Sequence, residues 1–290
     1  MYFGPLPTFI YKYQEPHLYE YLGGSIRFSI GETFNDIYDG EIYPGAESVE
    51  GIQDLKRQFI YCTSKSCHNN VMWGNYAENH KGFCIAYNPR SLLIDTNTSW
   101  ADSIKYTDSP LGDDIDSLYG GMIFPQDIDN PKCNPITLPH MVKYQFRKEK
   151  SWQYEEEFRL VLGDPNHEDR KFLDVPININ SVEKIIFGFR AEREFIENVM
   201  RQFANTNILF FKSTPSKVEY KITSDTLVYF KDDEVRYKNI GDFSKFVNSF
   251  ILGAREDSIN GKIYRDTLLQ MKFGQHEFMP QLHDIPELTS

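Results

Sequence analysis

The interpretation of the chain depends on the stretch Trp152-Gln153-Tyr154-Glu155-Glu156-Glu157-Phe158-Arg159-Leu160-Val161-Leu162. Its second half is typical of a β-strand, and alternation along a strand places Glu155, Glu157 and Arg159 on one face. Glu156 then points to the opposite face. Two carboxylates and a guanidinium on one face indicate either a solvated surface with weak ion pairs or the wall of a polar pocket. Spacing alone favours the solvated surface.

Further short strands are predicted on both sides of this stretch, with few helices between them. Apolar runs or alternation predict strands at 8–13, 25–30, 58–63, 82–87, 103–106, 156–163, 182–189, 208–212 and 217–223. Helices are predicted at 70–79, 140–150 and 191–205, the last being the most clearly amphipathic. Because strands and helices mix irregularly, the sequence predicts an α+β fold rather than a βαβ alternation.

The chain divides unevenly. Residues 108–139 are dense in Gly, Pro, Asp and Asn, which predicts a long surface loop. After residue 223 the pattern changes to short strands or turns, one helix near 243–252 and a tail that contains proline. We therefore expect an α+β core domain at 1–223 and a C-terminal appendage at 224–290.

Composition excludes some classes of partner. The 290 residues carry 31 Lys and Arg against 42 Asp and Glu, a formal net charge of -11, so nonspecific binding of duplex nucleic acid is disfavoured. The sequence shows neither a secretory signal nor an apolar run that would span a membrane. We expect a cytoplasmic protein with reduced thiols.

A second candidate site lies in the predicted helix 70–79. Trp73 and Tyr76 are three residues apart, so they share a helix face that could line a cleft where a planar ring stacks. For Trp73, simple core packing is the competing interpretation.

Other chemistries have little support in the sequence. The cysteines and histidines between residues 62 and 84 lack a paired Cys-x2-Cys spacing, and no metal site is expected. Neither a Gly-x-Ser-x-Gly elbow nor a phosphate-binding loop is present.

Several short motifs together resemble the bacterial domain-of-unknown-function family numbered 2971. They are Ile10-Tyr11-Lys12-Tyr13, Ile26-Arg27-Phe28-Ser29, Phe34-Asn35-Asp36, Tyr61-Cys62-Thr63-Ser64, Met72-Trp73-x-x-Tyr76 with His80-Lys81-Gly82, and Trp152-x-Tyr154-Glu155-x-Glu157-x-Arg159. The resemblance covers about Tyr11 to Phe211. The chain departs from the family pattern at Ile37, where proline is common.

The order of these elements more distantly resembles ADP-ribosyltransferase-like folds. That resemblance implies a split antiparallel sheet with flanking helices that binds NAD. It implies Glu157 as the catalytic carboxylate, with Glu155 beside it, because loss of nicotinamide leaves an oxocarbenium-like ribose. The residues implied for NAD binding are Lys12, Tyr13, Arg27, Asn35, Ser64, Trp73, Tyr76 and Arg159. Lys12 departs from the His or Arg usual at its position, because lysine offers only a point charge.

The expected function is therefore that of an ADP-ribosyltransferase or NAD glycohydrolase, with NAD as substrate. Its acceptor would be a protein or a nucleic acid, and its setting a toxin-like role in bacterial defence. One alternative is a noncatalytic nucleotide- or protein-binding regulatory module. Another is a metal-dependent nuclease that uses Asp36, Glu155 and Glu157, which the acidic net charge disfavours.

Overall fold

The computed structural model describes residues 2–21, 24–40, 58–108, 145–163, 170–231 and 234–239. The strands are β1 (Tyr2–Phe3), β2 (Ile10–Gln14), β3 (Ser25–Ile30), β4 (Phe59–Ser64), β5 (Phe83–Tyr87), β6 (Trp100–Ser103), β7 (Lys105–Thr107), β8 (Arg147–Glu149), β9 (Glu157–Leu162), β10 (Phe172–Pro176), β11 (Val182–Phe187), β12 (Leu209–Pro215), β13 (Ile222–Lys231) and β14 (Glu234–Asn239). The α-helices are α1 (Ile37–Gly40), α3 (Asn70–Tyr76), α4 (Pro89–Thr96) and α7 (Arg193–Gln202). Short 3-10 helices are η1 (Pro16–Tyr21), η2 (Gly31–Thr33), η4 (Lys150–Glu155) and η5 (Ile179–Ser181).

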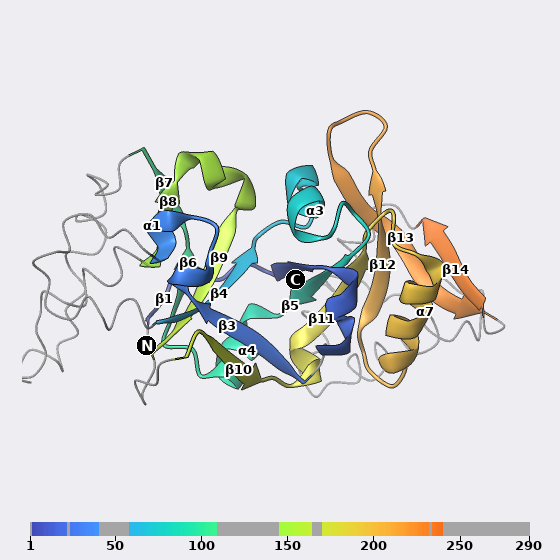
Figure 1. The fold of residues 1–290 in the computed structure, drawn as a ribbon. Coiled ribbons are helices and arrows are strands. Elements are labelled where there is room, and N and C mark those ends of the chain that lie inside the picture. The colour runs from blue at the N-terminus through green and yellow to red at the C-terminus, as the bar shows by residue number, and fades with distance from the viewer. Residues whose placement is uncertain are drawn as a thin grey trace, which may run out of the picture.

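In the described part of the chain, twelve strands form one large sheet, and β7 and β8 form a separate pair. The main path runs β1-β6-β9-β4-β2-β5-β11-β12-β13-β14, so β1 and β6 lie at one end and β14 at the other (Figure 1). Most neighbours are antiparallel; within the main sheet, β1–β6 and β11–β12 are parallel. The α+β class with a mostly antiparallel sheet and few helices is confirmed.

The sheet forks at β4. One edge of β4 pairs along its full length with β9. On the other edge, the N-terminal end of β4 pairs with β3 through Ile60 and Phe59, whereas Ser64 at the C-terminal end pairs with Tyr11 of β2. β3 continues into a branch with β10, and β2 continues into the long path through β5. The two branches therefore diverge beside the middle of β4.

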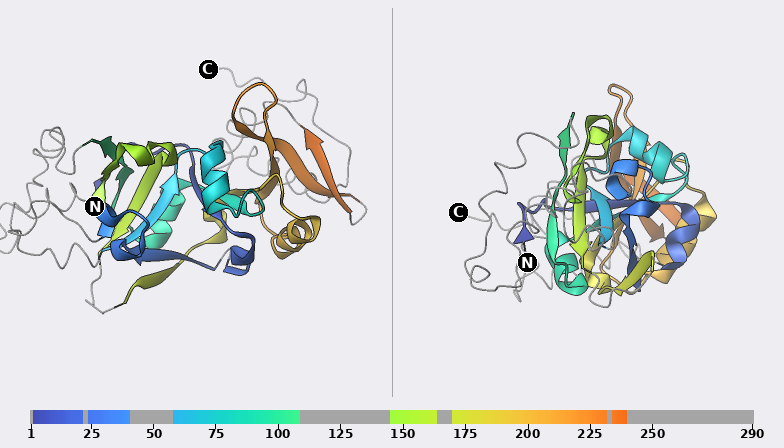
Figure 2. Two further views of the ribbon diagram at one scale, coloured as in Figure 1. Left: turned by 45° about the horizontal axis from the view of Figure 1, so that its top comes forward. Right: turned by 60° about the vertical axis from the view of Figure 1, so that its left-hand side comes forward.

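Helices cover both faces of the sheet, which explains why the central strands are apolar on both sides. On one face, Leu92 of α4 and Ile196 of α7 join the largest core cluster. On the other face, Met72 and Trp73 of α3 pack with a second cluster that includes Ile186. Two further views in Figure 2 show the same arrangement, with the β13–β14 hairpin at one end of the molecule. No helix in the described part of the chain combines the length and apolar character needed to span a membrane.

The turn after α3 fixes this helix against the sheet. Asn69 begins the helix, since its side-chain oxygen accepts from the backbone N–H groups of Val71 and Met72. The backbone then leaves the helix through three consecutive residues of left-handed conformation, at 78–80. At Gly82 a Cβ atom would lie 2.1 Å from the carbonyl oxygen of Gln14, the last residue of β2. Only glycine therefore lets the backbone before β5 approach β2 so closely.

Most predicted strands are present, and the main error concerns residues 147–150. The helix predicted at 140–150 is wrong at its end, where residues 147–149 form β8 and η4 begins at Lys150. Within the helix predicted at 191–205, α7 occupies residues 193–202. The predicted boundary at residue 223 falls inside β13, which pairs with β12 and continues the sheet. The predicted loop at 108–139, apart from its first residue, and the helix at 243–252 lie outside the described residues.

Candidate active site

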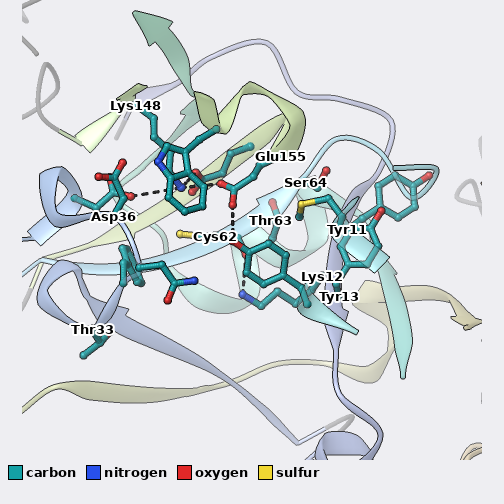
Figure 3. Close-up of a pocket in the computed structure, with 17 residues that line it drawn as sticks. Tyr11, Lys12, Tyr13, Thr33, Asp36, Cys62, Thr63, Ser64, Lys148 and Glu155 are labelled. Atoms are coloured by element: carbon teal, nitrogen blue, oxygen red, sulfur yellow. Dashed lines mark hydrogen bonds and ion pairs between the residues drawn. The ribbon is translucent and has the colours of Figure 1, made fainter. Parts of the chain in front are cut away.

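A pocket of about 250 Å³ lies beside the fork of the sheet. β2, β4, α3, η4 and the segment after β3 all contribute to it. The lining residues are Tyr11, Lys12, Tyr13, Thr33, Phe34, Asn35, Asp36, Asp39, Cys62, Thr63, Ser64, Met72, Tyr76, Lys148, Trp152, Glu155 and Glu157. In Figure 3, Asp36 and Lys148 lie on one side of the pocket and Tyr11 and Tyr13 on the other.

A fully buried guanidinium, that of Arg159 on β9, underlies the acidic side of the pocket. Its Nε donates to Oε1 of Glu157 at 2.6 Å, and its Nη2 donates to Oε2 of the same carboxylate at 3.1 Å. Nη2 also donates to Asp39 at 2.8 Å, and Nη1 donates to the carbonyl oxygen of Gln145 at 3.0 Å. Glu157 is thus bound bidentately, the geometry in which a guanidinium and a carboxylate interact most strongly.

Lys148 of β8 is a second cation in the same cluster. Its Nζ lies 2.7 Å from Oε2 of Glu155, 3.3 Å from Oε2 of Glu157 and 3.6 Å from Oδ2 of Asp39. The ammonium also lies 4.7 Å from the centre of the Trp152 ring, a cation–π distance. Two cations therefore bridge three carboxylates, that of Asp39 in α1 and those of Glu155 and Glu157 on either side of the junction between η4 and β9.

Glu155 reaches this cluster by a different route from the one that strand alternation predicts. The strand begins at Glu157, and Glu155 is the last residue of η4. Between them Glu156 adopts a left-handed conformation with φ 46°, which reverses the local direction and leaves its own side chain exposed. Oε1 of Glu155 then accepts a hydrogen bond of 2.5 Å from the Tyr76 hydroxyl. The prediction that Glu155 lies on the strand is wrong, although Glu155, Glu157 and Arg159 do meet and Glu156 does face away.

The favoured alternative of a solvated face is also wrong for these residues. Glu155 and Glu157 are 5% and 3% exposed, and Arg159 is inaccessible to solvent. Burial by itself would raise the pKa of Glu157, but the positive charges of Arg159 and Lys148 outweigh it and lower that pKa to about 2. Burial likewise opposes the charge on Lys148, yet the surrounding carboxylates raise its pKa above the ordinary value. Glu157 is thus a carboxylate at neutral pH.

Two tyrosine hydroxyls form hydrogen bonds with residues of the acidic cluster, Tyr76 as a donor to Glu155 and Tyr106 as an acceptor from the backbone of Glu157. Burial, and then the neighbouring carboxylate of Glu155, raise the pKa of Tyr76, so its hydroxyl remains a donor at neutral pH. The hydroxyl oxygen of Tyr106 instead accepts a hydrogen bond of 2.8 Å from the backbone N–H of Glu157. This last bond fixes the first residue of β9 beside the pocket.

Lys12 lies on the opposite side of the fork. Its Nζ donates to the carbonyl oxygen of Cys62 at 2.9 Å and lies 4.9 Å from the centre of the Tyr61 ring. The registered pairs of β4 with β3 and β2 leave residues 61–63 between the two branches. The side chain of Lys12 therefore links β2 to β4 through a hydrogen bond, beside the point where the pairing of these two strands ends.

Seven of the ten residues predicted for the site line this pocket, and three do not. Lys12, Tyr13, Asn35, Ser64, Tyr76, Glu155 and Glu157 line it. Trp73 is fully buried in the core beneath α3, with its indole N–H bound to the carbonyl oxygen of Cys67, so it offers no ring face to the pocket. Arg27 forms an exposed bidentate pair with Asp174 between β3 and β10. Arg159 lies behind Glu157 and is saturated by protein groups, which leaves it no position from which to bind a pyrophosphate.

Sequence reasoning missed Asp39 and Lys148 altogether. Asp39 follows a motif that drew attention to Asn35 and Asp36, and Lys148 fell in the segment predicted as a helix. Trp152 belongs to the motif that ends at Arg159, but its spacing predicts no role in the site. Lys148 and Lys150, seven and five positions before the acidic run that begins at Glu155, were the available signal, since buried carboxylates require counter-charges.

The same geometry bears on the nuclease alternative, which places a metal between Asp36, Glu155 and Glu157. The ammonium of Lys148 bridges Glu155 and Glu157 where a cation would have to bind. Within the ranges that the structure describes, no three or more His, Cys, Asp or Glu residues are grouped so as to hold a metal ion.

A comparison with protein families identifies one match. Residues 72–160 match the family described as "Protein of unknown function (DUF2971)". The matched segment contains the Met72-Trp73 motif and the run from Trp152 to Arg159, so the resemblance to this family is confirmed there. No curated protein and no solved structure matches the chain.

Proposed function

We propose that this chain consumes NAD, as an ADP-ribosyltransferase or an NAD glycohydrolase, with Glu157 as its catalytic carboxylate. One observation carries the proposal: Glu157 lines the pocket, and Arg159 and Lys148 keep it ionised although it is buried. Cleavage of the bond between nicotinamide and ribose develops positive charge on the ribose. A fixed carboxylate in a site of low dielectric stabilises such a charge strongly.

The architecture around the pocket supports the same proposal. An ADP-ribosyltransferase-like fold binds NAD in a split antiparallel sheet, and in this chain two branches of a mostly antiparallel sheet diverge from one edge of β4. The pocket takes residues from both sides of that divergence, with Lys12 from β2 and Asn35 from the segment after β3. The forked sheet is thus the counterpart that we propose for the split sheet.

The chemistry of the pocket walls also suits nicotinamide. Five aromatic residues line the pocket: Tyr11, Tyr13, Phe34, Tyr76 and Trp152. The nicotinamide ring of NAD is planar and positively charged, so aromatic faces and carboxylates both attract it. Lys12, Tyr13, Asn35, Ser64 and Tyr76 are the residues that we propose for contacts with NAD.

The proposed reaction has two steps. First, the bond between the anomeric carbon of ribose and the nicotinamide nitrogen breaks, and both bonding electrons leave with nicotinamide, which becomes neutral. Glu157 stabilises the oxocarbenium-like ribose, while Glu155 holds Lys148 and Tyr76 in place beside it. Water, or a nucleophilic group of a protein or nucleic-acid acceptor, then adds to the same carbon and releases one proton. A toxin-like role in bacterial defence is the setting that we propose for this reaction.

One feature favours a different function, that of a noncatalytic binding or regulatory module. Every oxygen of Glu155 and Glu157 already accepts a hydrogen bond from Tyr76, Lys148 or Arg159. In this alternative the saturated cluster holds η4 and β9 in place and takes no part in chemistry. In that case ligands would bind to the pocket without being changed.

The decisive experiment follows free nicotinamide after incubation of the purified protein with NAD. We expect release by the wild-type protein and a loss of at least about a hundredfold in Glu157→Gln, because the oxocarbenium ion loses a fixed negative charge. Asp174→Asn is the matched control, since Asp174 also pairs with an arginine but lies outside the pocket. Labelling of added proteins or nucleic acids separates a transferase from a glycohydrolase.

The folded state of Glu157→Gln has to be checked by circular dichroism and thermal melting, because the substitution leaves Arg159 with less counter-charge. A folded variant with unchanged turnover, or a wild-type protein with no turnover, contradicts the proposal. If NAD raises the melting temperature without being cleaved, the binding-module alternative gains support.

A further inference from the structure

We propose that Asp36 forms a binding subsite for an organic cation, of the guanidinium class, within this pocket. The inference concerns the pocket of the proposed function but does not depend on NAD turnover. It rests on three features: one unsatisfied carboxylate oxygen, an excess of negative charge, and aromatic walls.

The first feature is the state of the Asp36 carboxylate. Asp36 lines the pocket and is 6% exposed. Its Oδ1 accepts a hydrogen bond of 3.0 Å from the backbone N–H of Tyr38, whereas its Oδ2, also buried, has no hydrogen-bond partner among the described residues. A buried carboxylate oxygen without a partner is costly, so it calls for a physical explanation, and a bound ligand that donates a hydrogen bond to it is one such explanation.

The second feature is the charge balance. Among the described residues, four carboxylates line the pocket, those of Asp36, Asp39, Glu155 and Glu157, and three cations lie in or directly behind it, those of Lys12, Lys148 and Arg159. Lys148 and Arg159 form ion pairs with Asp39, Glu155 and Glu157, and Lys12 binds a backbone carbonyl. Within the described ranges Asp36 is the carboxylate of this set that no cation pairs. One negative charge in the pocket is thus left for a ligand to neutralise.

The third feature selects the kind of cation. One cation–aromatic contact already lies in the pocket wall, where the Lys148 ammonium lies over the ring of Trp152. The Lys12 ammonium, also in the wall, lies over the buried ring of Tyr61, which does not line the pocket. Phe34 lines the pocket two residues before Asp36. A guanidinium is planar, stacks on aromatic faces and is more weakly hydrated than an ammonium, so it loses less when it enters such a pocket.

A divalent metal ion is a poorer occupant of this subsite. Such an ion requires several oxygen ligands, and the other carboxylates that line the pocket are bound to Lys148 and Arg159. One N–H donor, by contrast, needs only the one free oxygen that Asp36 offers.

The test compares cations with neutral molecules of the same shape, in the absence of NAD. Methylguanidinium is titrated against methylurea, and a blocked tripeptide with a central arginine against one with citrulline, with binding followed by NMR. We expect each cation to bind at least about tenfold more tightly than its neutral counterpart, since a hydrogen bond to a charged group contributes about 1.5 kcal/mol or more. A preference for the peptide identifies an arginine side chain as the source of the guanidinium, and a preference for methylguanidinium identifies a free small molecule.

Asp36→Asn should weaken binding of the preferred cation at least about tenfold and leave binding of its neutral counterpart unchanged. Asp174→Asn, which alters a carboxylate outside the pocket, should change neither. Equal binding of guanidinium and urea to the wild-type protein overturns the inference without recourse to any variant. Because no measurement involves NAD, guanidinium binding by a protein that does not cleave NAD would leave this inference intact and contradict the proposed function alone.

Discussion

Two arginine–carboxylate pairs of this molecule have nearly the same geometry and opposite surroundings. On β9, Arg159 binds Glu157 through hydrogen bonds of 2.6 and 3.1 Å. Between β3 and β10, Arg27 binds Asp174 through hydrogen bonds of 2.8 and 2.9 Å. The side chains of the first pair are 0% and 3% exposed, and those of the second are 57% and 50% exposed. The two pairs therefore have similar hydrogen-bond distances and differ in how deeply they are buried.

Burial changes what such a pair does. In water an ion pair gains little, because the solvent screens the charges and solvates each partner when they separate. In the interior neither partner can be removed without leaving the other charged, unpaired and cut off from water. The β9 pair thus fixes Glu157 as an anion at the pocket, whereas the pair of β3 and β10 is a surface contact with no consequence for the site.

The largest expected effect comes from removing one buried cation. Arg159→Leu leaves Glu157 and Asp39 with Lys148 as their shared cation, and we expect it to destabilise the fold by about 3 to 5 kcal/mol. Arg27→Leu, the matched surface variant, should cost less than about 1 kcal/mol. Urea unfolding followed by circular dichroism measures both, and similar losses in the two variants would contradict the comparison.

The second largest effect concerns the pH dependence of stability, to which Glu157 should contribute more than Asp174. The pKa of Glu157 is lowered in the folded state from an ordinary 4.5 to about 2. Its contribution to stability is therefore fully present above pH 4.5 and is lost as the pH falls from there to about 2, a loss on the order of 3 kcal/mol. Hydrogen bonding to Arg27 also lowers the pKa of Asp174, but this group is exposed, so its contribution should be small.

Free energies of unfolding, measured from pH 7 to pH 2, test this expectation. In Glu157→Gln the decline at acid pH should be shallower than in the wild-type protein, because the titrating group is gone. The decline should be almost unchanged in Asp174→Asn. If the stability of Glu157→Gln falls with pH as steeply as that of the wild-type protein, other carboxylates govern the acid sensitivity.

A neutral partner of the cluster should matter less than a charged one. Tyr76→Phe removes the hydroxyl that donates to Glu155 and leaves the ring in place. We expect a loss of about 1.5 to 3 kcal/mol, the range for a hydrogen bond to a charged group. The exposed Tyr220 offers a matched substitution, and Tyr220→Phe should leave stability unchanged. Thermal or urea unfolding measures the stability of both variants. Equal losses of stability in the two would show that the hydrogen bond from Tyr76 to Glu155 does not stabilise the protein.

The sequence predicted the strands of this fold better than it predicted the site's surroundings. The pattern that predicts a strand is local, so the apolar run at the end of β9 is enough to predict that strand. Whether the polar face of that strand is solvated or buried is decided by Asp39 and Lys148, which come from other segments. Spacing along one strand carries no information about partners so distant, and this explains why it favoured the wrong environment for Glu157 and Arg159.

Helical spacing had a similar limit at Trp73 and Tyr76. Residues three apart are neighbours on a helix, but they point about 60° apart around its axis. That angle is enough here to place Trp73 in the core while Tyr76 reaches the pocket. The prediction that Glu155 lies on the same side as Glu157 is confirmed, but strand alternation is not the reason. The left-handed conformation of Glu156 places the side chain of Glu155 on that side.

The smallest expected effect has the opposite sign and concerns the carboxylate that no cation pairs. Burial raises the pKa of Asp36 above its ordinary 3.8, although the hydrogen bond from the Tyr38 backbone opposes this. A carboxyl group with a raised pKa in the folded state costs stability at neutral pH, and that cost disappears as the pH falls below 3.8. Asp36→Asn should therefore stabilise the free protein at pH 7 by up to about 1 kcal/mol and leave it unchanged at pH 3. Urea unfolding at the two pH values measures the difference. A destabilised Asp36→Asn at pH 7 would mean that Asp36 is satisfied within the free protein, in which case Asp36 belongs with Glu157 as part of the framework rather than with the groups kept free for a ligand.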